Sequence, residues 1–421
     1  MTLIGVDDTD SRELGMCTTY VAARLAERVR EHGGHVERTL LVRLNPAVEH
    51  KTRGNAALAV HCDLPPDEAL ELAADALDRA ATADPRTNPG AVVADARPET
   101  VPDAVADVAR RAVREHVDLN DVRDVLETAG FETAERGMGR GLIGATAAVG
   151  AWAAFDEWTY ECISYRERDR WGTDRDVDYD SLFAAADDGY PDVWDTVDRD
   201  EGAAVCVPRT PCPILHGIRG DDPDAVRAVA ERIESEPVAR RHTFVTNQGT
   251  DAHLRDGTIG DLQEGRAYRV TGTVASAPET REGGHVFVSL EGDGGELRCA
   301  AFEPTKRFRD RVRTLRVGDR VTVCGEVGDG TLKLEKFAVR DLVRTERVTP
   351  DCPDCGRSMK SAGANAGYRC RDCGTSADGK VERETEREIE EGWYEVPPVA
   401  RRHIAKPLVR GGFDAPTHPE Q

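Results

Sequence analysis

The sequence predicts a multidomain α+β protein made of four consecutive parts, and three observations predict it. Strand-like and helix-like segments alternate through about the first 260 residues, a period-two apolar pattern follows, and two Cys-x-x-Cys pairs stand near the end. A length of 421 residues is consistent with several domains. We place the parts at residues 1–120, 121–262, 263–345 and 346–421.

The first part opens with a strand and a helix that flank a polar turn. The apolar run Leu3 to Val6 predicts a short buried strand, and Val21, Leu25 and Val29 have helical spacing. Carboxylates follow the strand, and hydroxyl residues follow a glycine turn before the helix. A second strand, residues 36–44, and a third, residues 56–61, come next, and an Ala-rich helix begins at the Pro65-Pro66 pair.

The polar turn predicts a site for metal-assisted phosphoryl transfer. Carboxylates at a strand end are ligands that Mg²⁺ prefers, and the free N–H groups at a helix start attract phosphate. The alternative is that the same residues serve only as ordinary turn and cap residues. The predicted residues are Asp7, Asp8 and Asp10, with Asp7 and Asp8 as magnesium ligands and Gly15 and Thr19 as phosphate-binding residues.

Two further segments could bind phosphate. The polar loop 44–55 carries Lys51 and Arg53, which could neutralise a nucleotide, although a plain surface turn explains them equally well. The segment from Arg136 to Gly144 combines glycines with arginines, so its backbone can approach an anion closely; a tight loop is the alternative. Its predicted phosphate-binding residues are Arg136, Gly137, Gly139 and Arg140.

The rest of the second part offers weaker signals. A helix around Val122 to Leu126 ends at Gly130, and a strand is expected over 159–166. Residues 167–202 are rich in Asp, and we expect an exposed excursion there. After a further helix, a dense polar cluster follows an apolar pair and contains Asn247 and Asp251.

The third part predicts a small barrel of the OB type. Apolar residues alternate with polar ones over residues 268–274, 286–290, 321–323 and 332–337, and several short strands in about 75 residues are typical of a fold that binds oligonucleotides. A basic stretch, residues 304–316, falls between these strands, where the fold often carries a helix. Its predicted RNA-contacting residues are Lys306, Arg307 and Arg309.

The fourth part carries the strongest spacing signal. Cys352, Cys355, Cys370 and Cys373 form two Cys-x-x-Cys-Gly knuckles separated by fourteen residues. Four thiolates at this spacing predict a closed structural zinc site in a zinc ribbon. We expect a Glu-rich helix over 381–391, followed by a basic arm whose predicted RNA-contacting residues are Arg401, Arg402, Lys406 and Arg410.

The net charge of −22 argues at first against a nucleic-acid partner. Only seven of the 56 basic residues are Lys, however, and abundant acid with scarce Lys is typical of proteins that stay dissolved in high salt. The two basic stretches therefore stand out as phosphate-contacting segments, with a chance solvated face as the alternative. No stretch reaches the ~20 apolar residues of a membrane span, and no leader precedes the first strand, so we expect a cytoplasmic protein.

Several blocks of the sequence resemble the archaeal tRNA-isoleucine 2-agmatinylcytidine synthetase family. These blocks are Gly5-Val-Asp-Asp-Thr-Asp-Ser11 with Gly15-Met-Cys-Thr-Thr19, Lys51-Thr-Arg-Gly-Asn55, Arg136-Gly-Met-Gly-Arg-Gly141, Gly217-Ile-Arg-Gly220 and Thr246-Asn-Gln-Gly-Thr-Asp251. The barrel and the ribbon extend the resemblance over nearly the whole chain. The resemblance implies that the first part is an ATP-dependent kinase-like domain and the second a ferredoxin-like domain.

The resemblance also implies a reaction. ATP would activate the wobble cytidine of the CAU anticodon of tRNA-Ile by phosphorylating the oxygen on carbon 2, and agmatine would displace the phosphate. ATP would yield AMP and pyrophosphate, and Thr18 matches a threonine that the family phosphorylates. The implied cofactors are ATP, Mg²⁺ and Zn²⁺, and no obligate protein partner is inferred. Because agmatine is a dication, its pocket should contain carboxylates, and chemistry alone suggests Asn247 and Asp251 as its contacts.

Three other functions fit parts of the sequence. Metal-binding carboxylates also serve nucleases and phosphoesterases, which form no AMP and need no amine. A barrel with a zinc ribbon can be a non-catalytic RNA-binding protein. A different nucleoside kinase would act without agmatine.

Overall fold

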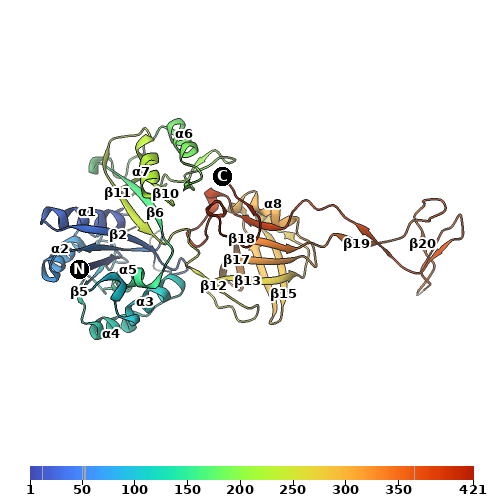
Figure 1. Ribbon diagram of the computed structural model, residues 1–421, viewed down its shortest axis with the longest axis horizontal. Coiled ribbons are helices and arrows are strands. Elements are labelled where there is room, and N and C mark those ends of the chain that lie inside the picture. The colour runs from blue at the N-terminus through green and yellow to red at the C-terminus, as the bar shows by residue number, and fades with distance from the viewer. Residues whose placement is uncertain (12, 50, 52–53, 365) are drawn as a thin grey trace.

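The computed structural model describes residues 1–421 apart from residues 12, 50, 52, 53 and 365. The molecule is elongated (Figure 1). An α/β body formed by the first half of the chain lies at one end, a β-barrel lies next to it, and the zinc-ribbon segment extends away from the barrel at the other end. The predicted multidomain α+β class is confirmed.

One nine-stranded mixed sheet runs through the whole α/β body. Across the sheet the strands are β5 (Glu132–Glu135), β4 (Gly90–Asp95), β1 (Thr2–Asp7), β3 (Ala56–Cys62), β2 (Val36–Arg43), β11 (Val238–Thr246), β6 (Thr159–Arg166), β10 (Ile214–Gly220) and β7 (Val193–Trp194). Neighbouring strands pair antiparallel except β2 and β11, which are parallel. Both of the first two predicted parts therefore contribute to a single sheet.

Helices cover the two faces of this sheet because the strands alternate. Ile4 and Leu41 pack under one helical layer, whereas their neighbours Leu3 and Leu40 pack under the other. The first layer contains α1 (Thr18–Glu31) and α2 (Pro66–Leu77). The second layer contains α3 (Asp103–Arg114), α4 (Leu119–Ala129) and α5 (Leu142–Ala154).

The predicted elements of the first part are present. The helix predicted at the start of the second part is α4, and it ends at Gly130, whose φ of 68° permits the left-handed cap. Strand β5 and helix α5 lie beyond residue 120 but pack on the N-terminal strands β4 and β1. The four-part division of the chain stays a prediction.

The expectation of an exposed excursion over residues 167–202 is wrong. Helix α6 (Tyr179–Gly189) lies in this stretch and packs on α7 (Pro223–Arg232), with Leu182 and Ala185 buried between them and the strands β6 and β10. The many aspartates obscured a few apolar residues at helical spacing. Short elements complete the body: η1 (Pro98–Thr100), η2 (Arg168–Arg170), β8 (Val197–Asp198) and β9 (Ala203–Ala204).

The predicted OB-type barrel is confirmed as a closed barrel of five strands. Its strands pair in the order β13–β15–β16–β18–β17 and back to β13. The bounds are β13 (Ala267–Val274), β15 (Val286–Gly292), β16 (Gly295–Ala301), β17 (Arg320–Gly328) and β18 (Thr331–Asp341). Helix α8 (Phe308–Arg313) lies in the basic stretch between β16 and β17 and buries Phe308 and Val312 in the barrel core.

Shorter elements extend the barrel at its edges. They are β12 (Leu254–Asp256), β14 (Glu279–Thr280), η3 (Glu282–Gly284), η4 (Glu303–Thr305), β24 (Gly392–Glu395), η5 (Pro398–Ala400), η6 (Leu408–Arg410) and β25 (Thr417–His418). Strand β24 pairs with β18 and β25 with β24, so the end of the chain returns to the barrel after the ribbon.

A two-stranded stalk of β19 (Thr345–Val348) and β23 (Val381–Glu384) carries the ribbon (Figure 1). The prediction of a helix over 381–391 is wrong. Strand β23 pairs with β19 there, and its glutamates alternate along an exposed strand. The ribbon contains β20 (Lys360–Ser361), β21 (Tyr368–Arg369) and β22 (Ser376–Ala377).

The four cysteines of the ribbon lie close together. Their sulfur atoms all lie within 4.8 Å of one another, and the Sγ atoms of Cys355 and Cys370 are 3.6 Å apart. Sulfurs of a tetrahedral site with Zn–S bonds of about 2.3 Å are roughly 3.8 Å apart, so this geometry fits the predicted structural zinc. No helix in the described part of the chain combines the length and apolar character needed to cross a membrane.

Removing zinc should unfold the ribbon alone. Among the described residues of the ribbon, the buried cluster consists of Cys352, Met359 and Cys370, with Tyr368 and Ala377 packed against it. This cluster is too small to fold without the metal, whereas the barrel has an extensive core of its own. After chelation we expect trypsin to cut first at Arg357, Lys360 and Arg369, as read by peptide mass spectrometry. Adding Zn²⁺ back should restore resistance; a metal-free protein that still resists cleavage there would contradict the prediction.

Candidate active site

A cavity of about 460 Å³ opens at the carboxyl end of β1. The start of α1, the start of α5, the loop after β2 and the segment 205–214 surround it. Among the residues that line it are Asp7, Asp8, Asp10, Cys17, Thr18, Thr19, Arg43, Lys51, Arg140, Glu161, Arg209 and Arg219. The structure thus brings the three predicted acids, both predicted threonines, Lys51 and Arg140 together.

The acids differ in their surroundings. Burial, followed by the neighbouring Asp8 carboxylate, raises the pKa of Asp7 well above its ordinary value. Asp8 has a φ of 57° and accepts hydrogen bonds from Arg140 Nη2 at 2.8 Å and from the backbone N–H of Asn88 at 3.2 Å. Burial raises the pKa of Asp8 as well, and Arg140 opposes the shift.

The three carboxylates do not all converge on one point. In the part of the chain that the structure describes, only the four ribbon cysteines form a group of three or more potential metal ligands within 4.8 Å of one another. Asp7 and Asp8 are adjacent and face one cavity, so these two residues are the carboxylates that could share a cation with a bound phosphate.

The first turn of α1 presents hydroxyl groups and free N–H groups to the cavity. Gly15 and Met16 have φ values of 80° and 61°, and this turn directs the chain from β1 into the helix. Thr18 is buried, and its Oγ1 accepts a hydrogen bond from the hydroxyl of Thr9 at 3.1 Å. A helix start with these groups is suited to binding an anion.

The glycine-rich segment serves close packing. A Cβ on Gly144 would overlap a carboxylate oxygen of Asp7, and one on Gly141 would lie 2.6 Å from the backbone oxygen of Asp7. These glycines therefore let α5 start directly against the end of β1. Arg140 reaches the cavity from this segment, whereas Arg136 points away and pairs with Asp78 at 2.8 Å.

Other predicted phosphate-binding residues lie elsewhere. Gly15, Gly137 and Gly139 do not line the described cavity. Gly137 and Gly139 have φ values of 64° and 68° and shape the turn before α5. Arg53 lies outside the residues that the structure describes.

Three charged residues that we did not predict form one side of the cavity. Glu161 on β6 accepts hydrogen bonds from Arg43 Nη2 at 2.9 Å and from Arg219 Nε at 3.3 Å. Burial alone would raise the pKa of Glu161, but Arg219 and Arg43 outweigh it, so the pKa is lowered and the carboxylate stays ionised. Arg219 lies in the block Gly217–Gly220, which had suggested no role; a lone Glu within an apolar strand was the signal for Glu161.

The two residues guessed to contact agmatine are engaged elsewhere. The side-chain amide of Asn247 bonds to the backbone N–H and C=O of Arg43 at 2.7 and 3.1 Å. Asp251 accepts hydrogen bonds from the buried Lys336 ammonium at 2.6 and 2.8 Å. Neither residue lines the described cavity, and both hold elements of the fold together.

The predicted RNA-contacting cations are largely paired with acids. Arg307 pairs with Asp198 and Glu420, and the buried Arg401 pairs with Asp195 and Glu395. The remaining pairs are Lys306 with Glu201 and Glu303, Arg309 with Glu303, Arg402 with Glu326 and Glu335, Lys406 with Glu157, and Arg410 with Glu157 and Asp221. Several of these pairs join the barrel side of the molecule to the α/β body.

Comparisons with known proteins cover the whole chain. Three family models match, described as the TiaS TCKD domain over residues 3–138, the TiaS FLD domain over 139–253 and the TiaS C-terminal zinc ribbon domain over 349–389. A fourth, described as an OB-fold nucleic acid binding domain, matches residues 268–333.

A relative from Haloquadratum walsbyi, named as the isoleucine-tRNA 2-agmatinylcytidine synthetase TiaS, is 55% identical, and the match covers 100% of both chains. A crystal structure of TiaS in complex with its isoleucine tRNA and ATP superposes with a TM-score of 0.89 at 40% identity, covering 100% of this chain and 99% of the other. A complex of TiaS with the same tRNA, AMPCPP and agmatine superposes with a TM-score of 0.87 at 37% identity and the same coverage. The chain belongs to the TiaS family, the isoleucine-tRNA 2-agmatinylcytidine synthetases.

Proposed function

We propose that this protein uses ATP to conjugate agmatine to carbon 2 of the wobble cytidine in the CAU anticodon of an isoleucine tRNA. Its relatives are named for this product, and similar crystal structures contain the isoleucine tRNA, ATP or AMPCPP, and agmatine. The observation that carries the proposal is the cavity itself, in which acids, a helix start and several cations surround one space. We expect the reaction to take place in the cytoplasm.

The chemistry requires activation before substitution. The oxygen on carbon 2 of cytosine is a poor leaving group, but its phosphate ester is a good one. ATP would be hydrolysed to AMP and pyrophosphate, and one phosphoryl group of the pyrophosphate would be transferred to that oxygen as inorganic phosphate leaves. The primary amine of agmatine would then form the new C–N bond as the C–O bond breaks and a second phosphate leaves. Phosphoryl transfer depends mainly on positioned charge, and the cavity supplies this with Arg140, Lys51 and the start of α1.

Asp7 and Asp8 are proposed to hold Mg²⁺. The two carboxylates sit side by side in a half-buried position, and their mutual repulsion contributes to the raised pKa of Asp7. A bound cation would offset that repulsion. Magnesium would supply charge neutralisation for the phosphates, while Asp10 would complete the acidic edge of the cavity.

Thr18 is proposed to be a phosphoryl acceptor during the reaction. Its hydroxyl lies at the helix start that would hold the phosphates, and the hydrogen bond from Thr9 fixes its orientation. Thr19 and Gly15 would shape the phosphate-binding turn.

The barrel, the ribbon and the basic segments are proposed to hold the tRNA. Among the seven predicted contacts, the side chains of Lys306 and Arg402 are about one-third exposed and could exchange acidic partners for phosphates. The side chain of Arg401 is only 4% exposed and pairs with two buried carboxylates, which favours a structural role for that residue. The target base must leave the anticodon stack to reach the cavity.

Incubation of the unmodified isoleucine tRNA with the protein, ATP, Mg²⁺ and agmatine in high salt should yield an agmatine adduct on cytidine, detected by nucleoside mass spectrometry, together with AMP. A methionine tRNA with the same CAU anticodon is the matched control and should stay unmodified. Cleaved tRNA would indicate a nuclease, intact bound tRNA a binding protein, and turnover without agmatine a nucleoside kinase; each would contradict the proposal.

Arg140→Met should lower kcat for AMP formation by about 100-fold, because the cavity would lose a guanidinium that faces the phosphate site and holds Asp8. Arg136→Met is the matched control: it removes an arginine from the same segment, but one that pairs with Asp78 outside the cavity. Equal effects of the two substitutions on kcat would show that the segment matters only for folding.

Thr18→Ala should abolish labelling of the protein by γ-³²P-ATP and reduce tRNA modification. Affinity for tRNA should change by less than about tenfold, because phosphate contacts spread over the surface dominate binding. Thr18→Ser keeps a hydroxyl at the same position and should retain both activities. Full modification by the alanine variant would remove Thr18 from the mechanism.

A further inference from the structure

One wall of the cavity is an irregular segment, residues 205–214. It precedes β10 and contains neither a helix nor a strand before Ile214. Seven of its residues line the cavity: Val205, Cys206, Pro208, Arg209, Thr210, Cys212 and Ile214. A Cβ on Gly15 would lie 4.0 Å from the backbone oxygen of Pro211, so the wall approaches the phosphate-binding turn.

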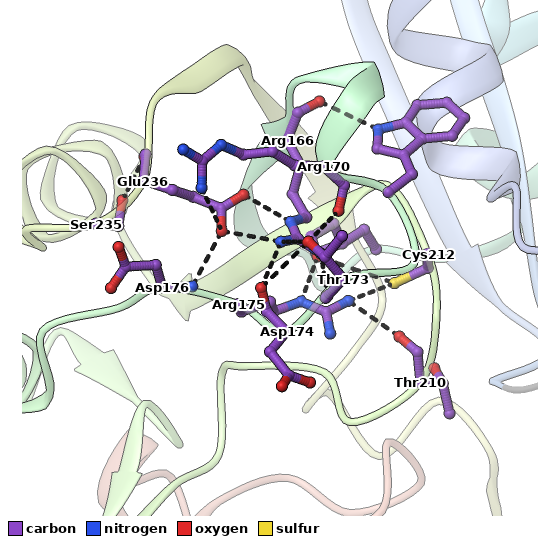
Figure 2. A network of polar contacts seen from close by, with 12 residues as sticks. Arg166, Arg170, Thr173, Asp174, Arg175, Asp176, Thr210, Cys212, Ser235 and Glu236 are labelled. Atoms are coloured by element: carbon purple, nitrogen blue, oxygen red, sulfur yellow. Dashed lines mark hydrogen bonds and ion pairs between the residues drawn. The ribbon is translucent and has the colours of Figure 1, made fainter.

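Arg175, from a different loop, bonds to this wall at three points. Its Nε donates to the backbone oxygen of Ile214 at 2.9 Å, and its Nη2 lies 3.0 Å from the backbone oxygen of Thr210 and 3.2 Å from Cys212 Sγ. Figure 2 shows the guanidinium between the Arg175 loop and the wall. A planar fork of donors can hold several acceptors in one geometry, which the single ammonium of lysine cannot.

The loop that carries Arg175 is itself fixed by a buried ion pair (Figure 2). Arg166, at the end of β6, bonds to both carboxylate oxygens of Glu236 at 2.7 and 2.9 Å, and both side chains are at most 1% exposed. The same guanidinium donates to the backbone oxygens of Thr173 and Asp174, and Glu236 accepts the backbone N–H of Asp176. Residues on both sides of Arg175 are therefore tied to a rigid strand.

The wall carries a cation that no acid among the described residues neutralises. Arg209 lines the cavity, is exposed, and forms no ion pair or hydrogen bond with the described residues through its side chain. By contrast, Arg140 pairs with Asp8, and Arg43 pairs with Glu161. A free guanidinium at the edge of a phosphate-binding cavity can bind phosphate bidentately.

We propose that Arg209 binds a phosphate group of a substrate and that Arg175 is the positioning residue that holds it at the cavity. The proposal rests on the proposed function, which supplies the two phosphate sources, ATP and the anticodon backbone of the tRNA. Arg175 acts through the wall and touches no reacting atom. The Arg166–Glu236 pair is the fixed support for this arrangement.

The test compares Arg175→Met and Arg209→Met with the matched control Arg168→Met. Arg168 is exposed on the same loop as Arg175, and its side chain contacts no polar group among the described residues. Each variant is assayed for kcat and KM with ATP and with tRNA, for thermal unfolding, and for the rate at which iodoacetamide alkylates Cys212, which is read by peptide mass spectrometry. Cys212 is buried in the wild-type protein and bonded to Arg175, so its alkylation reports whether the wall is held.

Arg209→Met should raise the KM for either ATP or tRNA by about tenfold, as expected for loss of a charged hydrogen bond to phosphate. Arg175→Met should raise the same KM by about tenfold, because the wall would no longer hold Arg209 at the cavity. A raised KM for ATP assigns the phosphate to the nucleotide, and a raised KM for tRNA assigns it to the anticodon backbone. Alkylation of Cys212 should accelerate about tenfold or more in Arg175→Met only, because only that variant frees the wall. Arg175→Lys keeps the charge but only part of the hydrogen bonding, so its KM and its rate of Cys212 alkylation should be intermediate. Arg168→Met should match the wild type in both.

Either of two results would overturn the proposal: a wild-type KM for both substrates in Arg209→Met, or unchanged Cys212 alkylation in Arg175→Met. Wild-type protein that forms no AMP would instead contradict the proposed function. In that case the alkylation rates still decide whether Arg175 holds the wall.

Discussion

The parallel contact between β2 and β11 is the constraint on which the cavity depends. It spans only two residue pairs, and the strands come from segments about 200 residues apart in the chain. Beyond the last pair, the side-chain amide of Asn247 accepts from the backbone N–H of Arg43 and donates to its C=O. A primary amide offers the same donor and acceptor as a peptide group, so Asn247 prolongs the ladder where the strands diverge.

Because Asn247 fixes the backbone of Arg43, the Arg43 side chain extends across the contact between β2 and β11 to Glu161 on β6. Arg219 on β10 meets the same carboxylate. Glu161 is nearly inaccessible to water, and a buried carboxylate without partners would be strongly unfavourable. The charged side of the cavity is therefore complete only when both halves of the sheet are joined, which links formation of the site to folding of the whole body.

Local patterns predicted much of this molecule, and contacts between distant segments account for what they missed. The strand, turn and helix around Asp7 and Thr18, the barrel alternation and the cysteine knuckles are signals contained within short windows, and the structure has them. The local signal for Glu161, a lone Glu in a strand, did not reveal its role in a charged cluster, because its two partners are 118 and 58 residues away. The aspartate-rich composition likewise concealed α6, whose apolar side becomes recognisable only against α7.

The basic stretches illustrate the same limit and give the acidic composition a structural consequence. In a chain with a net charge of −22, acidic partners are abundant, and Arg307 and Arg401 each find one in the α/β body, Asp198 and Asp195. Salt screens exposed pairs strongly but buried pairs much less, so the buried Arg401–Asp195 pair would help to keep the barrel in place beside the cavity even in concentrated salt. The exposed stalk gives the ribbon no such support, because β19 and β23 lack a core of their own. A fixed contact next to the cavity and a slender arm beyond it suit the proposed reaction, in which one extruded base would be placed accurately while the rest of a large RNA is held at a distance.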